Sequence, residues 1–396
     1  MSVTVNVRSE LRRYNLPEDF KIELERLLED NVARVHSRTR VSKNPLSLKT
    51  QAYRIQKICH AFVELRENGY ALKSPWALKQ KHVEALVDIW VRKKLTGGTI
   101  ENKLTYLRAL AEWMHKPNLI GPLESYVDRK EHGLVRSYIA TEDKSWEGNG
   151  VDSIEKMAEI AHTDKYVAVQ LRLQLTFGLR VEESFLLRPV ESVGDDGMLH
   201  VTRGTKGGRN RVVPIGDGLD VLKEAAALTN PVSKTTIPLG YTKHQWKDRF
   251  YRVLRKHGVR KSALGITAHG LRHQNFHAMY EALAGVKAPV KGTGEIAPKA
   301  QHEEARRQVV EAAGHSRPSI ANAYLSTHRV QQQKAPDVTF DQVRDAIAKF
   351  DGNKKAAANF LQISRQKMYR IIQRHGSVTF SHSLPNVTLA ESLITQ

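Results

Sequence analysis

The stretch Gly314-His-Ser-Arg-Pro-Ser-Ile-Ala-Asn-Ala-Tyr324 decides how the second half of this chain is interpreted. It places Tyr324 nine residues after His315. A phenol has an unperturbed pKa of about 10, so as a nucleophile it needs a proton acceptor or nearby positive charge. The residues that could supply such charge stand upstream, in three short motifs.

These motifs hold the candidate cations. Arg180 stands in Phe-Gly-Leu-Arg-Val-Glu-Glu, Lys206 in Lys-Gly-Gly-Arg-Asn-Arg, and Arg272 in His269-Gly-Leu-Arg. A guanidinium stays charged at every working pH, and its planar fork fits two phosphate oxygens. We therefore interpret Arg180 and Arg272 as a phosphate clamp. His269 and His315 can each hydrogen-bond a non-bridging oxygen, and His269 can also carry a proton near neutral pH.

In this order, and over about 150 residues, the motifs resemble the tyrosine recombinase (phage integrase) family. The resemblance covers roughly residues 150 to 330 and is nearest to integrases of prophages and other mobile elements. It implies that Tyr324 attacks a DNA phosphate, leaving a 3′-phosphotyrosyl link and a free 5′ hydroxyl. Because the link stores the bond energy, strand exchange needs no metal, ATP or other cofactor. Four protomers are implied to act on two duplexes through a Holliday junction.

The resemblance also implies roles for residues around the clamp. Lys206 is the general acid for the departing 5′ oxygen. Arg209 and Arg211 are the alternatives in the same basic turn, and we expect them to contact the DNA backbone instead. Glu183 lies three residues after the first clamp arginine, on the same helical face, so it can orient that guanidinium. Its neighbour Glu182 is a competitor for this role.

A metal site is a second interpretation of the histidines. His269, His273 and His277 are four residues apart, so a helix would stack them on one side. No fourth ligand stands at a usual spacing and no cysteine is near. We therefore disfavour this alternative and expect no metal.

Composition limits the partner and the compartment. The 396 residues carry a formal net charge of +20, which favours a polyanion such as nucleic acid. The single cysteine, Cys59, excludes an internal disulfide framework, fits a reducing cytoplasm and is expected to be buried. No apolar run of membrane-spanning or signal-peptide length occurs. We expect a cytoplasmic, nucleoid-associated protein with no membrane partner.

Periodicity predicts a mainly α fold with one small antiparallel β element. Helices are expected over residues 48–67, over 81–94 and after Thr99, and a β-hairpin over 198–203 and 209–215. Five segments follow: a basic N-terminal arm (1–45), a helical core DNA-binding domain (46–135), a tyrosine recombinase catalytic domain (150–330), a helix-turn-helix (337–376) and a flexible tail (377–396).

The appended C-terminal segment departs from the usual family pattern. Thr339 and Gln342 predict a capping box, with Val338 and Val343 as a hydrophobic staple. The following residues, GNKKAAANFLQISRQKMYRIIQRHG, resemble the DNA-binding end of Fis-type proteins. We interpret this unit as an additional DNA-binding element for an accessory or arm-type site. The gap between Arg272 and His315 is also about twenty residues longer than usual, which predicts a surface insertion at 285–300.

Basic residues outside the catalytic motifs are candidate DNA contacts. They comprise an acid-free run after Asn31, the hairpin turn and one face of the C-terminal segment: Arg34, Arg38, Arg40, Lys43, Arg54, Lys57, Arg209, Arg211, Arg365, Lys367, Arg370 and Arg374.

Three functions are compatible with these residues. The leading hypothesis is a site-specific recombinase acting on double-stranded DNA attachment sites as a homo-tetramer, with a directionality or host architectural factor as partner. The alternatives are a non-catalytic DNA-binding regulator and a type IB topoisomerase-like enzyme. Because the chain carries every catalytic residue of the pattern, decay to a regulator is disfavoured.

Overall fold

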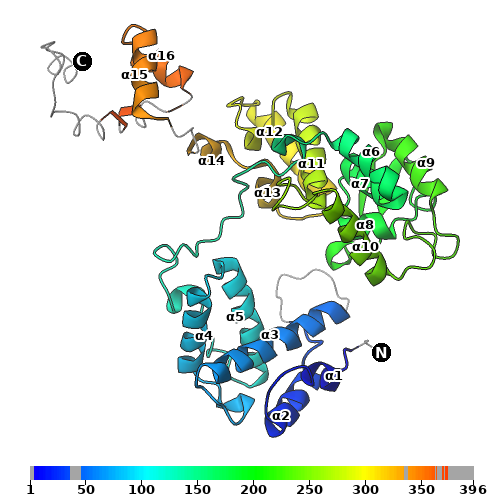
Figure 1. Cartoon of the computed structure of the whole chain (residues 1–396), viewed down its shortest axis with the longest axis vertical. Coiled ribbons are helices and arrows are strands. Elements are labelled where there is room, and N and C mark those ends of the chain that lie inside the picture. Colours follow the sequence, from blue (N-terminus) through cyan, green and yellow to red (C-terminus); the bar gives the residue numbers. More distant parts are fainter. Residues whose placement is uncertain are drawn as a thin grey trace, which may run out of the picture. The chain divides into compact units, whose positions relative to one another are not determined.

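The computed structural model describes residues 4–35, 46–333, 338–361, 363, 368–369 and 371–372. The chain divides into two compact units (Figure 1). The first comprises Met1–Ser137 with the short stretch Gly207–Arg209, and the second comprises Tyr138–Lys206 and the residues from Asn210 onward. Both are mainly helical, which confirms the predicted fold class. In this described part, no helix combines the length and apolar character needed to cross a bilayer.

The first unit is an all-helical module. Its helices are α1 (Val7–Leu11), α2 (Glu18–Glu29), α3 (Leu48–Glu67), α4 (Gln80–Arg92) and α5 (Gly97–Trp113). The prediction for α3 is confirmed at both ends, because Ser47 caps its first turn and the chain leaves it at Asn68. Cys59 is buried on α3 as expected, and burial raises the pKa of its thiol to about 12, so it stays protonated.

The described part of the N-terminal stretch is folded onto this module. Val7 and Leu11 of α1, together with Phe20 and Leu24 of α2, are buried in the same core as the apolar face of α3. Residues 4–32, predicted as part of an arm, therefore contribute to the first unit's core.

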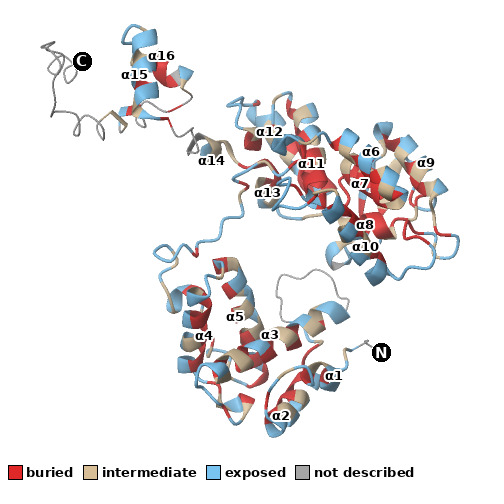
Figure 2. Ribbon diagram, viewed as in Figure 1, coloured by how far each residue is buried: buried red, intermediate tan, exposed pale blue. Residues whose placement is uncertain are grey.

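The second unit is built around two long helices. Its elements are α6 (Ser153–Thr163), α7 (Lys165–Phe177), α8 (Val181–Leu186), β1 (Met198–Val201), β2 (Arg211–Pro214), α9 (Leu219–Ala227), α10 (Lys243–Lys256), α11 (Ala268–Ala284), α12 (Lys299–Ala312), α13 (Asn322–Leu325) and α14 (His328–Gln333). Helices α7 and α11 pack on each other and are largely buried (Figure 2). They form the scaffold that holds the candidate site.

The predicted hairpin is present and shorter than expected. Strand β1 pairs with β2 in antiparallel register, from Met198 opposite Pro214 to Val201 opposite Arg211. Along β2 the side chains alternate between buried and exposed, so Arg211 and Val213 face inward. The turn contains a short 3₁₀ helix, Lys206–Gly208.

Two further segments follow α11 along the chain: a long connection and the C-terminal helices. The surface insertion predicted at 285–300 is only partly exposed: residues 291–300 are mostly exposed, whereas Ala288, Pro289 and Val290 are buried in the second unit. Lys291 pairs with Glu281 of α11 at 2.7 Å. The helices α15 (Phe340–Lys349) and α16 (Lys354–Phe360) form a separate small core. The capping box between Thr339 and Gln342 is confirmed.

Candidate active site

The candidate site is organised around the buried carboxylate of Glu183. This residue is 0% exposed and lies in the first turn of α8. Its Oε1 accepts hydrogen bonds from Arg180 Nη1 at 2.5 Å and from Arg211 Nη1 at 2.7 Å. Its Oε2 accepts from the main-chain N–H of Arg180 at 2.6 Å and from Arg211 Nη2 at 2.8 Å. One carboxylate therefore caps its own helix and fixes two guanidinium groups.

The charge of Glu183 is maintained by these partners. Burial alone would raise the pKa of its carboxyl, but hydrogen bonds and charge from Arg211, with the charge of Arg180, outweigh burial and lower the pKa to about 2. Arg272 adds a third cation, with Nη1 lying 3.8 Å from Glu183 Oε2. Three guanidinium groups against one carboxylate leave an excess of positive charge, which suits a phosphate.

The two clamp arginines lie side by side on one carbonyl. Nη2 of Arg180 and Nη2 of Arg272 each donate to the main-chain oxygen of Ala313 at 2.7 Å. Arg272 is 0% exposed, and its Nη1 also donates to the carbonyl of Gly178. Burial lowers the pKa of Arg272 to about 10, so the group remains a cation at neutral pH.

Two glycines allow this approach of the chain. Gly178 ends α7 with a φ of +58°, and a Cβ there would stand 2.6 Å from Asn275 Oδ1. Gly314 has a φ of +69°, and a Cβ there would stand 3.2 Å from Cδ of Arg211. Both positions need the left-handed conformation, which glycine adopts without steric cost. The motifs around Arg180 and His315 therefore contain glycine for geometric reasons.

Tyr324 lies against this group of cations. It is 6% exposed on the short helix α13, and its hydroxyl accepts a hydrogen bond from Arg272 Nε at 3.3 Å. Its ring packs edge-on against Phe276 at a centroid distance of 4.8 Å and, at a tilt of 53°, against His273 at 4.9 Å. The structure therefore brings the predicted nucleophile to one of the predicted clamp arginines within a single chain.

The two predicted histidines flank the same region. His315 Nε2 lies 3.4 Å from Arg180 Nη2. His269 stands in the first turn of α11 and is exposed. The protein packed around its ring, together with the charges of Arg272 and Arg180, lowers the pKa of His269 to about 4. At neutral pH this imidazole is neutral and can accept a proton.

The remaining histidines of α11 stack as the sequence suggests. The ring centroids of His269 and His273 are 5.2 Å apart, and those of His273 and His277 are 6.1 Å apart. Within the described residues, no group of three His, Cys, Asp or Glu side chains could hold a metal ion.

Lys206 is not brought to the arginines. It lies exposed in the hairpin turn, and among the described residues it makes no hydrogen bond or ion pair. Arg209 is also exposed in this turn. Arg211 differs, and the DNA contact predicted for it is corrected: its guanidinium is buried against Glu183. The signal was the two-residue period of β2, which places Arg211 on the same face as Val213.

The competitor Glu182 faces away from the site. It is exposed, and its Oε1 pairs with Nζ of Lys243 at 2.6 Å. Glu183, and not Glu182, therefore orients Arg180.

The DNA contact predicted for Arg54 is also corrected. Arg54 is buried in the first unit, where Nη1 donates to the carbonyls of Val32 at 2.8 Å and Arg34 at 2.6 Å. Arg34 is exposed and Lys57 half-buried, so contact with DNA remains a prediction for both. The other predicted contacts lie outside the described residues: Arg38, Arg40, Lys43, Arg365, Lys367, Arg370 and Arg374.

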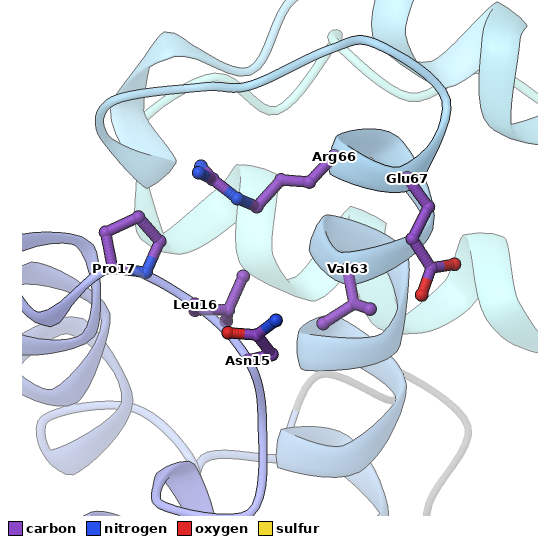
Figure 3. Close-up of a pocket in the computed structure, with 6 residues that line it drawn as sticks. All are labelled: Asn15, Leu16, Pro17, Val63, Arg66 and Glu67. Atoms are coloured by element: carbon purple, nitrogen blue, oxygen red, sulfur yellow. The ribbon is translucent and has the colours of Figure 1, made fainter.

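The first unit also has a surface hollow next to α3 (Figure 3). Its lining residues are Asn15, Leu16, Pro17, Val63, Arg66 and Glu67. None of the predicted catalytic residues lines it, since all of those belong to the second unit.

Comparison with protein families gives three matches along the chain. Residues 143–276 match a family described as Integrase, and residues 40–119 match one described as Phage integrase, N-terminal. Residues 336–375 match one described as Bacterial regulatory protein, Fis family. The two integrase matches together cover more than half of the chain, and the first includes Arg180, Lys206, His269 and Arg272. No curated protein matches the chain.

Solved structures share the fold. The chain is similar to a lambda integrase dimer bound to a COC′ core site, with 14% identity, a TM-score of 0.50, and coverage of 77% of this chain and 95% of that chain. It is also similar to a lambda integrase tetramer bound to a Holliday junction, with 14% identity, a TM-score of 0.50, and coverage of 78% and 77%.

Proposed function

This chain belongs to the tyrosine recombinase (phage integrase) family, and we propose that it recombines DNA at specific sites with Tyr324 as its nucleophile. The observation that carries the proposal is the Tyr324 hydroxyl, 3.3 Å from Nε of the buried Arg272. A phenol in that position is next to a cation that can also bind the phosphate under attack.

The reaction breaks one phosphodiester bond and forms another. The Tyr324 oxygen attacks phosphorus while the bond to the 5′ oxygen breaks, which leaves a 3′-phosphotyrosyl link. Arg180 and Arg272 stabilise charge on the non-bridging oxygens, and His315 donates to one of them. Neutral His269 accepts the phenol proton. Attack by a 5′ hydroxyl on the link reverses these steps and rejoins the strand.

Lys206 supplies the proton for the departing 5′ oxygen. An exposed ammonium in a turn can move down onto a bound phosphodiester, where the long lysine side chain reaches the leaving group. Arg211 does not contact DNA as we propose for Arg209 in the same turn. It holds Glu183 and, through Glu183, Arg180. It is a positioning residue.

DNA is the substrate, and the chain acts as an oligomer. Lambda integrase, which shares this fold, is known as a dimer on a core site and as a tetramer on a Holliday junction. We extend the tetramer to this protein, with attachment sites of a prophage or other mobile element as substrate. The match to the Fis family supports a further DNA contact by the C-terminal segment. A directionality or host architectural factor completes the assembly at the nucleoid.

The proposal is tested with a suicide DNA substrate carrying the ends of the element. Wild-type protein should form a covalent adduct on a denaturing gel, and Tyr324→Phe should form none. Tyr280→Phe is the matched control, because Tyr280 is also buried on the second unit but bonds to His302. It should form the adduct. No adduct with wild-type protein on its cognate ends would support the regulator, and relaxation without strand exchange would support the topoisomerase.

A further inference from the structure

His277 is a buried histidine that the proposed chemistry does not use. It lies two turns along α11 from His269, and its Nε2 is 2.9 Å from the main-chain oxygen of Tyr324. Two residues of α11 thus hydrogen-bond the nucleophile: Arg272 its hydroxyl and His277 its backbone.

The end of α13 explains why this carbonyl needs a partner. A helical carbonyl accepts from the N–H four residues later, and the last carbonyls of a helix lose that partner. Helix α13 ends at Leu325, and Ser326 leaves it with a φ of 64° and a ψ of −162°. This conformation is rare for any residue except glycine. The Tyr324 carbonyl therefore points away from a continuing helix and towards His277.

The contact fixes which nitrogen carries the proton. A carbonyl oxygen only accepts, so Nε2 of His277 must be the donor. Burial lowers the pKa of His277 more than the charge of Asp143 raises it, so the ring is neutral at neutral pH. Its Nδ1 then carries the lone pair, and among the described residues this buried nitrogen has no hydrogen-bond partner.

A second segment braces the same helix. The main-chain N–H of Ala140 donates to the carbonyl of Asn322 at 2.8 Å, at the start of α13. Three residues later, Asp143 Oδ1 lies 3.6 Å from Nδ1 of His277. The N–H of Ala140 and the Nε2–H of His277 thus hold α13 near its start and near its end.

We propose that His277 is a positioning residue for the nucleophile, which uses its Nε2–H to hold the backbone of Tyr324 so that the phenol stays on Arg272. This inference rests on the proposed function. It requires that the donor, and not the bulk of the ring, sets the rate at which the phosphotyrosyl link forms.

The test compares replacements that separate the donor from the volume. His277→Phe and His277→Leu remove the donor and differ in size, whereas His277→Gln keeps an N–H donor. The single-turnover rate of adduct formation is measured on the suicide substrate, and DNA affinity is measured separately. Both apolar variants should lose about 10- to 100-fold in rate, the range of one lost hydrogen bond, with DNA affinity within about twofold of wild type. His277→Gln should recover most of the rate.

Other outcomes would overturn the inference. Wild-type rates in both apolar variants would show that the donor is not needed. A similar loss in His277→Gln, or unequal losses that follow side-chain volume, would assign His277 to packing. A variant that fails to fold is recognised by its lost DNA affinity, and folding that depends on ring volume again assigns packing. Absence of any adduct from wild-type protein would instead refute the proposed function, so the two failures are distinguishable.

Discussion

The β-hairpin contributes to two regions of the site that differ sharply in burial. At its base, Arg211 is buried and joined to Glu183 by two hydrogen bonds. In its turn, Lys206 and Arg209 are exposed. The buried cluster of Glu183 and three arginines is thus arranged before DNA arrives, and such preorganised charge needs no rearrangement during the reaction. Lys206, which we propose as the general acid, is exposed, and we expect it to reach its position only when substrate binds.

The largest effect is expected at the centre of the buried cluster. Arg272→Lys keeps the charge but loses the planar fork that bonds Tyr324, Gly178 and Ala313. We expect the rate of adduct formation to fall by about 10³-fold, the upper range for loss of one oxyanion donor. Single-turnover cleavage of the suicide substrate measures it. Arg307→Lys, an exposed arginine on α12, is the control and should cleave normally.

Glu183→Gln tests whether the cluster is held by charge. The pKa of Glu183 is lowered to about 2 from the ordinary value of 4.5. Its carboxylate therefore stabilises the fold fully above about pH 4.5, and this contribution is lost as pH falls towards 2. At neutral pH the variant should lose about 3 kcal/mol of unfolding free energy. Urea unfolding at several pH values from 7 to 3 should show the difference in unfolding free energy between wild type and variant becoming smaller.

Two controls sharpen this result. Glu182→Gln, which removes an exposed carboxylate, should leave stability nearly unchanged at every pH. Arg211→Ala should resemble Glu183→Gln, because it breaks the same buried pair from the other side. If Arg211→Ala were as stable as wild type, the buried cluster would not be held together by the Glu183–Arg211 pair.

Lys206→Ala tests the exposed turn of the β-hairpin. We expect a loss of about 10²-fold in cleavage, the lower range for a positioned general acid, with no change in urea unfolding. A substrate with sulfur in place of the departing 5′ oxygen has a leaving group that needs no proton. Cleavage of that substrate should be nearly equal for wild type and variant. An equal deficit on both substrates would contradict the general-acid role.

The smallest effect is expected for Arg209→Ala. This exposed arginine should contribute one phosphate contact, so its loss should weaken DNA binding by about 1 kcal/mol. The slope of the logarithm of the binding constant against the logarithm of the salt concentration should become shallower by about one. Binding titrations at several salt concentrations measure both. Unchanged affinity and salt slope would remove Arg209 from the DNA-contacting surface.

Much of the site could be predicted from the sequence because the chemistry restricts the residue types. Metal-free attack on a phosphate needs a nucleophile and cations, and short motifs with glycine at tight approaches mark Arg180, Arg272 and Tyr324. Local signals also placed α3, whose Ser47 cap and Asn68-Gly69 exit are visible in the sequence. The hairpin followed from alternation between Gly-containing segments.

The errors have a common cause. Arg54 and Arg211 were interpreted as DNA contacts because basic residues usually face solvent, yet each follows the buried periodicity of its own element. Arg54 precedes Ile55 and lies one turn before Ile58, both fully buried. Contacts to main-chain oxygens, such as those of Ala313 and Tyr324, leave no mark in the sequence because any residue supplies a carbonyl.

The oxygen of Ala313 has a consequence for how this protein can vary. Both clamp arginines donate to the same main-chain oxygen. The distance between the two guanidinium groups is therefore set by the backbone and not by any side chain. A point mutation at position 313 replaces the alanine methyl group but keeps the carbonyl oxygen that both arginines contact. Substitutions at position 313 should therefore leave the spacing of the two clamp arginines unchanged. Replacing the amide that follows Ala313 by an ester would be the chemical way to change this spacing.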